Sequence, residues 1–357
     1  MRKTVILETH NIKNQYTGFG VFNHGLISGL SHHDHSNLDI VLLAYKPSVL
    51  KDKFGNAFRY KKIYSFNRYK NFSVRKKHDL WHSVNQNLKF EPKKVSNYLL
   101  TVHDVNFAEG SSREDTTSKR KKLFIEKLNR SSAITYISEF AKEQTHRYFN
   151  VPNVPEYIVF NGNPIITIAN TSDYKPNTPV DKPFLYSVGD FLQKKNFTSI
   201  IQMMLHVKDF NLIISGDYNK PYGEEVKKCI LDNNLSDRVF LTGRICETGK
   251  QYYLQHCAAF LFPSRGEGFG LPPIEAMKFG CPIFLANCTS LPEIGGEYAF
   301  YWDEFDAESM AAEFYKGMDT YHNNPDLYRQ KYAERANFYN WDKTAKQYLD
   351  IYNSILR

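Results

Sequence analysis

The chain has 357 residues, of which 42% are hydrophobic and 24% charged; this indicates a globular protein long enough for two domains of about 100–200 residues each and excludes a disordered or collagen-like chain. No apolar run reaches the ~18 residues that cross a bilayer, and the N-terminal stretch Val5–Leu7 is too short for a signal sequence, so we expect a protein of the cytoplasm or of the inner membrane face. Residues 1–170 contain 26 Lys and Arg against 14 Asp and Glu, a net +12, and the remainder contains 20 against 24, a net −4; the first half is expected to meet an anionic partner.

Short apolar segments, many of them β-branched, alternate with helix-like segments in the first half. Strands are expected at Thr4–Glu8, Leu38–Tyr45, Asp79–Val84, Tyr98–His103, Ile134–Ser138 and Tyr157–Phe160. Helices are expected near Val21–Leu30, Ser118–Arg130 and Glu139–Phe149. Ser138 is the expected N-cap of the last helix. The next segment, Asn161–Val180, is rich in Pro, Asn, Thr and Ser and lacks apolar periodicity, which predicts a linker.

The second half repeats the alternation. Strands are expected at Phe184–Val188, Leu212–Ser215, Val239–Thr242, Ala259–Phe262, Ile283–Ala286 and Phe300–Trp302. Helices between them include Asn196–His206, Tyr222–Asn233 and Pro273–Phe279. We therefore predict an α/β protein with two Rossmann-like, doubly wound parallel sheets, domains at 1–165 and 180–335, and a ligand cleft between them. The helix at about 341–357 has an apolar face and is expected to pack back on the first domain.

The most informative motif is FPSRGEGFGLPPIEAM at Phe262–Met277. A strand runs into a glycine-rich loop and then a Pro-initiated helix, an arrangement that presents backbone N–H groups to an anion. Glu267 lies in the loop, and Glu275 is expected in the first helical turn. Two carboxylates at this separation suit two sets of hydroxyls on one extended ligand. The alternative is a tight structural turn.

This motif, continued through Gly280–Asp306, resembles the retaining glycosyltransferases of family 4, in which two glutamates are separated by seven residues. The likeness is greatest to bacterial mannosyltransferases of polysaccharide and lipopolysaccharide assembly. It implies the GT-B fold and transfer of a hexose, with mannose from GDP-mannose favoured, to a glycan or lipid-linked glycan. UDP-sugars are the alternative donors.

The resemblance also implies site residues. The donor's phosphates would meet Lys195 and Lys194, although many relatives have arginine where this chain has Asp190. The implied catalytic residues are Glu267, His103 and Lys195. The implied donor-binding residues are Gly20, Gly189, Lys194, Lys195, Arg244, Gly268, Phe269, Gly270, Leu271 and Glu275. Gly20 belongs to the TGFGV segment, expected as a loop before a helix, and His103 stands with Asp104 at a strand end. Residues on the acceptor side would be His82, Asn85 and Asp104.

No metal or cofactor is expected. The five cysteines are odd in number and lack CxxC spacing, and GT-B enzymes generally work without a catalytic metal. His32, His33 and His35 cluster around Asp34, but they stand in a polar segment that is expected to be a solvated loop.

The segment Arg59–Lys77 has eight basic residues, no acidic one and five interleaved aromatic rings. This composition is typical of segments that bind an anionic membrane surface or a single-stranded nucleic acid. The alternative is a solvated loop. The resemblance favours membrane or acceptor contact, so nucleic acid is not expected. Rival functions are an epimerase or phosphorylase of the same fold and a non-catalytic scaffold that binds nucleic acid or membrane.

Overall fold

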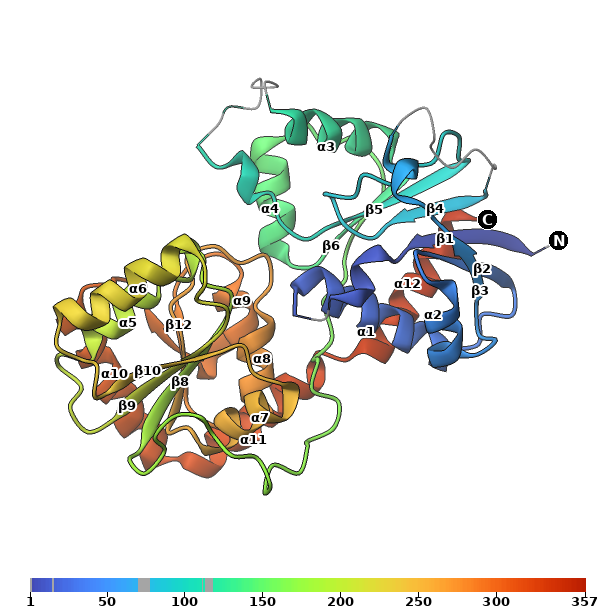
Figure 1. The fold of residues 1–357 in the computed structure, drawn as a ribbon. Helices are drawn as coiled ribbons and strands as arrows, with labels where there is room; N and C mark the ends of the chain where they lie inside the picture. Colours follow the sequence, from blue (N-terminus) through green and yellow to red (C-terminus); the bar gives the residue numbers. More distant parts are fainter. Residues whose placement is uncertain (1, 15, 70–77, 111, 113–117) are drawn as a thin grey trace. The chain divides into compact units, whose positions relative to one another are not determined.

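The computed structural model describes residues 2–14, 16–69, 78–110, 112 and 118–357. The chain divides into two compact units (Figure 1). Unit 1 comprises Met1–Pro164 and Tyr339–Arg357, and unit 2 comprises Ile165–Phe338. The C-terminal helix α12 (Trp341–Ile355) thus belongs to unit 1. Among the described residues, no helix is long and apolar enough to cross a membrane.

Unit 1 is built on a seven-stranded sheet in the order β3-β2-β1-β4-β5-β6-β7, paired in parallel throughout. Its strands are β1 (Lys3–Glu8), β2 (Leu38–Ala44), β3 (Arg59–Lys62), β4 (Leu80–Ser83), β5 (Asn97–Val102), β6 (Ala133–Tyr136) and β7 (Glu156–Ile158). Its longer helices are α1 (Gly18–His32), α2 (Pro47–Phe54), α3 (Lys119–Arg130), α4 (Glu139–Tyr148) and α12. Ser138 caps α4 as predicted, because its side chain accepts from the amide of Ala141 at 3.0 Å.

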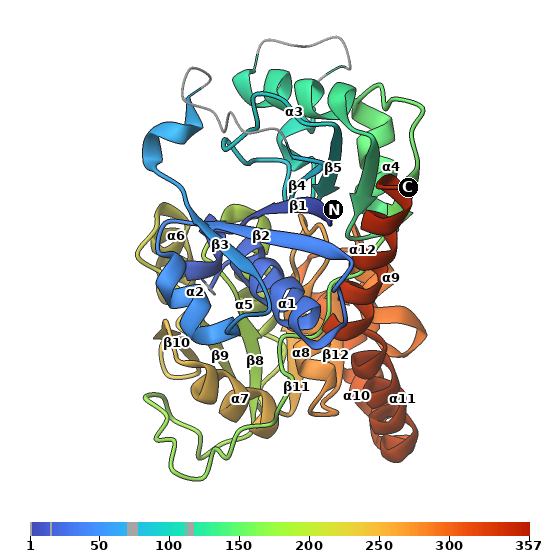
Figure 2. The same ribbon diagram turned by 90° about the vertical axis from the view of Figure 1, so that its right-hand side faces the viewer.

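Helix α12 lies beside α1 (Figure 2). Its predicted apolar face is real, since Tyr348, Ile351 and Tyr352 are buried. Two glycines of the unit leave the space that Trp341 occupies. A Cβ at Gly25 or Gly162 would lie within 2.4 Å of an atom of Trp341. The helix is therefore integral to unit 1 although it lies far away in sequence.

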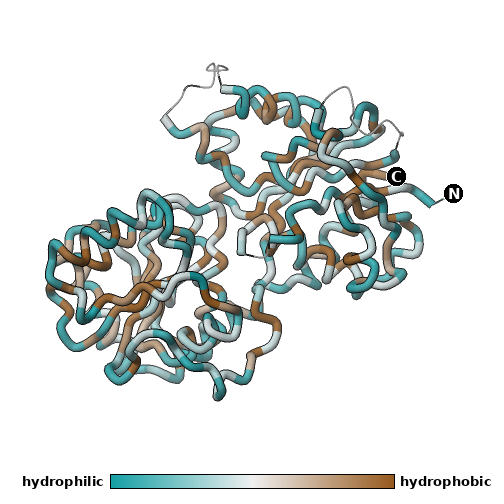
Figure 3. Tube along the Cα trace, viewed as in Figure 1, coloured by the Kyte–Doolittle hydropathy of each residue, from teal (hydrophilic) through white to brown (hydrophobic). Residues whose placement is uncertain are grey.

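Unit 2 has a six-stranded parallel sheet in the order β10-β9-β8-β11-β12-β13. Its strands are β8 (Phe184–Val188), β9 (Asn211–Ser215), β10 (Val239–Gly243), β11 (Ala259–Phe262), β12 (Ile283–Ala286) and β13 (Phe300–Trp302). Its helices are α5 (Phe197–Met203), α6 (Pro221–Asp232), α7 (Glu247–His256), α8 (Leu271–Met277), α9 (Leu291–Gly295), α10 (Ala307–Asn323) and α11 (Pro325–Phe338). In each unit hydrophobic segments concentrate on the strands, and hydrophilic ones on the outer helices and loops (Figure 3).

Two predicted boundaries are corrected. Helix α8 begins at Leu271, after Gly270 at φ 114°, so Glu275 lies in its second turn and not in the first. Gly18–Gly20 form the first turn of α1 and not a loop before it. At Gly20 a Cβ would lie 1.8 Å from the Asn14 carbonyl oxygen, so close backbone approach accounts for this glycine.

Candidate active site

The strand order of unit 2 reverses between β8 and β11. From β8 the chain proceeds to β9 and β10 on one side, and from β11 to β12 and β13 on the other. The loops that follow β8 and β11 therefore leave the carboxyl edge of the sheet on either side of one crevice, where open α/β sheets bind ligands. These two loops carry the predicted lysines and Glu267.

Ionic and backbone contacts join the two loops. The Lys195 ammonium forms an ion pair with Glu267 Oε1. Lys194 Nζ donates to the Gly266 carbonyl at 2.7 Å, and the amide of Arg265 donates to the Lys194 carbonyl at 2.7 Å. The structure thus brings together three predicted site residues that are up to 73 positions apart in sequence.

The Glu267 carboxylate is held in a defined position. Ser264 Oγ donates to Oε1 at 2.6 Å, and the side chain of Glu267 is 13% exposed. Burial alone would raise the pKa of this carboxyl, but Lys195 and Lys194 outweigh burial and hold the pKa below its usual value. The group is therefore a charged carboxylate at neutral pH. Ser290 Oγ donates to the Phe269 carbonyl at 2.7 Å, which fixes the same loop from behind.

Glu275 has a different environment. Its side chain is 6% exposed and bonds to Lys250 Nζ at 2.8 Å, and Lys250 also pairs with Glu247 at 3.0 Å. Burial raises the pKa of Glu275 more than Lys250 lowers it. The predicted ribose contact at Glu275 would therefore involve a carboxylate already oriented by a lysine.

The other predicted donor-binding residues of unit 2 follow β8, β10 and β11, and all but Arg244 belong to the two loops or the start of α8. Gly189 follows β8, and a Cβ there would be 3.4 Å from Lys195 Cε. Arg244 follows β10 and pairs with Asp217 at 3.0 Å. Asp190, where many relatives have arginine, pairs with Lys220 at 3.1 Å. Gly268, Phe269, Gly270 and Leu271 form the end of the glycine-rich loop and the start of α8.

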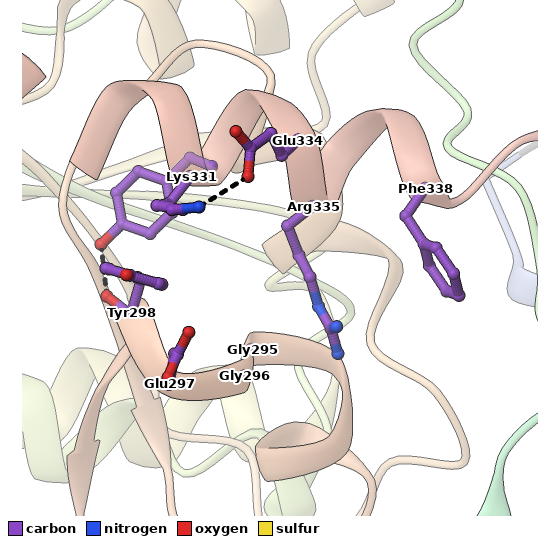
Figure 4. A pocket seen from close by; sticks show the side chains of 9 residues that line it. Gly295, Gly296, Glu297, Tyr298, Lys331, Glu334, Arg335 and Phe338 are labelled. Carbon is purple, nitrogen blue, oxygen red and sulfur yellow. Dashed lines mark hydrogen bonds and ion pairs between the residues drawn. The ribbon is translucent and has the colours of Figure 1, made fainter. Parts of the chain in front are cut away.

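A cavity of about 270 Å³ lies at the carboxyl end of α9, outside the two loops (Figure 4). Arg335 of α11 reaches toward this end and donates through Nε to the Ile294 carbonyl at 3.0 Å and through Nη2 to the Glu293 carbonyl. Because Ser290 immediately precedes α9 and contacts the Phe269 carbonyl, α9 connects Arg335 to the glycine-rich loop.

In unit 1, His103 lies just after β5. It is 6% exposed, Nε2 bonds to the Val84 carbonyl at 2.9 Å, and the rings of Phe19 and Phe22 are edge-on at 4.9 and 4.7 Å between centroids. Burial lowers the pKa of His103 to about 4, so the imidazole is neutral at pH 7.

His82 lies in the core, which corrects the expectation that it faces an acceptor. It is fully buried, and its nitrogens bond to the hydroxyls of Tyr352 and Thr101, each at 2.8 Å. Burial lowers its pKa to about 3. Asn85 is also buried, whereas Asp104 is half-buried and its carboxylate accepts from the Asn106 amide at 3.3 Å.

Sequence reasoning missed the residues that support the carboxylates. Ser264 stands three positions before Glu267, a spacing that hints at a contact, but nothing local links Ser290 or Lys250 to this loop. In the part of the chain that the structure describes, no group of three or more His, Cys, Asp or Glu side chains is placed to hold a metal ion.

Residues 170–336, which lie within unit 2, match the family "Glycosyl transferases group 1". The chain is 23% identical over 287 residues to O-antigen chain mannosyltransferase B of Escherichia coli, covering 73% of this chain and 71% of that protein. A glycogen synthase of Streptococcus pneumoniae (strain Hungary19A-6) is 25% identical over 190 residues, which are 49% of this chain and 39% of the synthase.

Solved structures share the fold over the whole chain. Sucrose-phosphate synthase from Thermosynechococcus elongatus has a TM-score of 0.73 at 17% identity, covering 99% of each chain. HepE of Anabaena, in complex with UDP and glucose, has a TM-score of 0.72 at 12% identity, covering 99% of this chain and 100% of that one. The predicted fold is confirmed: the chain has two Rossmann-like units with parallel sheets, and these structural neighbours are GT-B glycosyltransferases.

Proposed function

We propose that the protein is a retaining glycosyltransferase that moves a hexose, with mannose from GDP-mannose favoured, to a glycan or lipid-linked glycan in surface polysaccharide synthesis. The observation that carries the proposal is the Lys195–Glu267 pair, which joins the two loops at the switch point of the matched domain. The similarity to an O-antigen mannosyltransferase supports mannose as the sugar.

The proposed mechanism assigns each charged group a task. Lys194 and Lys195 would neutralise the diphosphate of the leaving nucleotide, as preorganised electrostatic catalysis. Glu267 would orient hydroxyls of the transferred sugar, and Glu275 the ribose. The acceptor would attack on the face that the leaving group vacates, and the donor phosphate would take the acceptor's proton. No metal or cofactor is assigned a part.

A UDP-sugar donor is the second candidate, because HepE was solved with UDP and glucose. Thermal shift of the full chain with GDP, GDP-mannose, UDP and UDP-glucose separates the two, since a ligand that binds the native state raises Tm. We expect a shift with the GDP compounds that is lost in Lys195→Ala and kept in Lys316→Ala, an exposed lysine of α10 that serves as the control in unit 2. A shift confined to the UDP compounds would indicate a UDP-sugar donor in place of GDP-mannose. No shift with any of the four compounds would contradict the transferase proposal.

Product analysis tests the class of reaction. NMR of the product should show the donor's anomeric configuration, because same-face attack retains it. An epimerised nucleotide sugar or a sugar phosphate would instead indicate an epimerase or a phosphorylase. Salt-sensitive oligonucleotide binding without nucleotide binding would indicate the scaffold.

We also propose that unit 1 contacts an anionic membrane at its basic aromatic segment, with the protein at the inner membrane face. Within its described part, Tyr64, Phe66 and Tyr69 are 47–62% exposed, and Lys62 Nζ lies 5.1 Å from the Tyr64 ring centroid. Aromatic rings beside cations suit the headgroup region of a bilayer. The rest of the segment, residues 70–77, lies outside the described residues.

A further inference from the structure

A histidine and a carboxylate form a close pair at the carboxyl edge of the unit 1 sheet. Glu8 ends β1 and is fully buried, and His10 begins the short 3-10 helix that follows. His10 Nδ1 lies 2.8 and 2.9 Å from the two Glu8 carboxylate oxygens, and the His10 amide donates to Glu8 Oε1 at 2.8 Å. The strand order of this sheet reverses between β1 and β4, so the pair stands at its switch point.

The pair fixes the hydrogen-bonding state of the imidazole. A carboxylate can only accept, so Nδ1 carries a proton, and in the neutral tautomer this leaves Nε2 as the acceptor. The side chain of His10 is 25% exposed, and within the described residues Nε2 forms no hydrogen bond. The buried Glu8 carboxylate also interacts electrostatically with the buried Lys127, so the carboxylate that orients His10 has a second charged neighbour.

Aromatic rings surround this acceptor. The His10 ring lies 5.3 Å from that of Phe90 and 6.4 Å from that of Tyr45, measured between centroids. Tyr45 is half-buried, and Lys13 Nζ is 5.4 Å from its centroid. A hydrogen-bond acceptor of fixed direction beside aromatic surface suits a sugar, which offers hydroxyl donors on its edge and C–H groups on its faces.

We propose that Glu8 and His10 form a binding site on unit 1 for a hydroxyl of the acceptor sugar. The hydroxyl donates to His10 Nε2, Glu8 holds the tautomer, and Tyr45 packs against the ring of the sugar. The role of this sugar as the acceptor rests on the proposed glycosyltransferase function. Sugar binding at Glu8 and His10 can be measured whether or not the protein is a transferase.

The test is saturation-transfer NMR of the full chain with methyl α-D-mannopyranoside, methyl α-D-glucopyranoside and methyl β-D-galactopyranoside. We expect at least one glycoside to bind the wild type, and His10→Ala to weaken that binding about tenfold, as for loss of one well-placed hydrogen bond and its desolvated partner. Glu8→Gln should weaken glycoside binding less, because His10 remains and only the fixing of its tautomer by the carboxylate is lost. His35→Ala, which removes a histidine of unit 1 that stacks on Phe58, is the control and should change nothing.

Folding and donor binding are checked separately. His10→Ala removes the hydrogen-bond partner of the buried Glu8 carboxylate, so Glu8→Gln/His10→Ala serves as the variant without that carboxylate. Nucleotide-induced thermal shift should be the same in all variants. Equal glycoside signals in wild type and the double variant, or no signal from any of the three glycosides, would overturn the site. A protein that binds glycosides through His10 but no nucleotide would instead overturn the transferase proposal.

Discussion

The two sheets share one topology but differ at their switch points. In unit 2 the loops after β8 and β11 meet through a lysine–carboxylate pair, with a second lysine beside it. In unit 1 a carboxylate-bound His10 follows β1, and the buried neutral His103, one strand beyond the switch point, bonds to the Val84 carbonyl after β4. Positive charge suits a diphosphate, and hydrogen-bond acceptors suit hydroxyls. The chemistry at the two edges is therefore divided in the way a donor and an acceptor would require.

The comparison also shows that the net charge of a unit does not locate its candidate ligand site. Unit 1 contains most of the excess positive charge, yet the pair at its switch point is one histidine and one carboxylate. Its cations include the exposed Lys61 and Arg68 of the basic aromatic segment. The excess positive charge of the first half thus includes exposed surface residues. The candidate phosphate-binding lysines belong to the second half, which has a net negative charge.

The largest expected effect is that of Glu267→Gln on turnover. Glutamine keeps the size and the contact with Ser264 but loses the charge that pairs with Lys195. If Glu267 acts as charge develops on the sugar, kcat should fall about a hundredfold while donor KM changes little. Steady-state kinetics with the donor found by thermal shift would measure this. Glu304→Gln, an exposed carboxylate of the same unit, is the control, and wild-type kcat in Glu267→Gln would contradict the assignment.

The second prediction uses pH to separate the units. His82 and His103 have folded pKa values of about 3 and about 4, against 6.5 in the unfolded chain. Between these values only the unfolded state takes the proton, so unit 1 should lose up to about 1.4 kcal/mol per histidine for each pH unit below 6.5. The Glu267 carboxyl in unit 2 has a lowered pKa, so its contribution is lost only as the pH falls below 4.5.

Tryptophan fluorescence can follow this difference. Trp81 and Trp341 lie in unit 1 and Trp302 in unit 2, so Trp302→Phe makes urea unfolding of unit 1 observable alone. We expect its midpoint to fall from pH 7 to pH 5.5, and His82→Gln to flatten that dependence. An unchanged midpoint over this range would show that the two histidines do not stay neutral in unit 1.

The sequence allowed most of the sheet to be predicted, because buried parallel strands are short, apolar and β-branched. It did not predict β3 (Arg59–Lys62), whose residues are largely exposed and which exists through its pairing with β2. The sequence predicts His82 on the acceptor side and gives no sign of its burial, because that burial depends on Tyr352, 270 positions later. The site shows the same limit: Lys195 and Glu267 were proposed from their own loops, whereas their pairing and the help of Ser290 arise only when distant loops meet.

A smaller effect is expected at Glu275. If it binds the ribose, Glu275→Gln should raise donor KM about tenfold with kcat nearly unchanged, because the contact is made equally in the ground and transition states. Circular dichroism would show that the variant folds. The contrast with Glu267→Gln is the informative result, since two buried, lysine-paired carboxylates would then differ in role as they differ in pKa. A fall in kcat with unchanged KM would reverse the assignment of the two carboxylates.

The smallest effect is expected at the basic aromatic segment. Lys61 is exposed, and within the described residues it forms no ion pair, so its charge is available to a lipid surface. Lys61→Ser should weaken sedimentation with phosphatidylserine vesicles about fivefold at low salt, which corresponds to about 1 kcal/mol for one charge. The difference should shrink at high salt, because screening shortens the reach of the charge. Lys51→Ser removes an exposed lysine of the same unit outside the segment and should bind like the wild type; an equal loss in both variants would mean that overall charge, and not this surface, attracts the membrane.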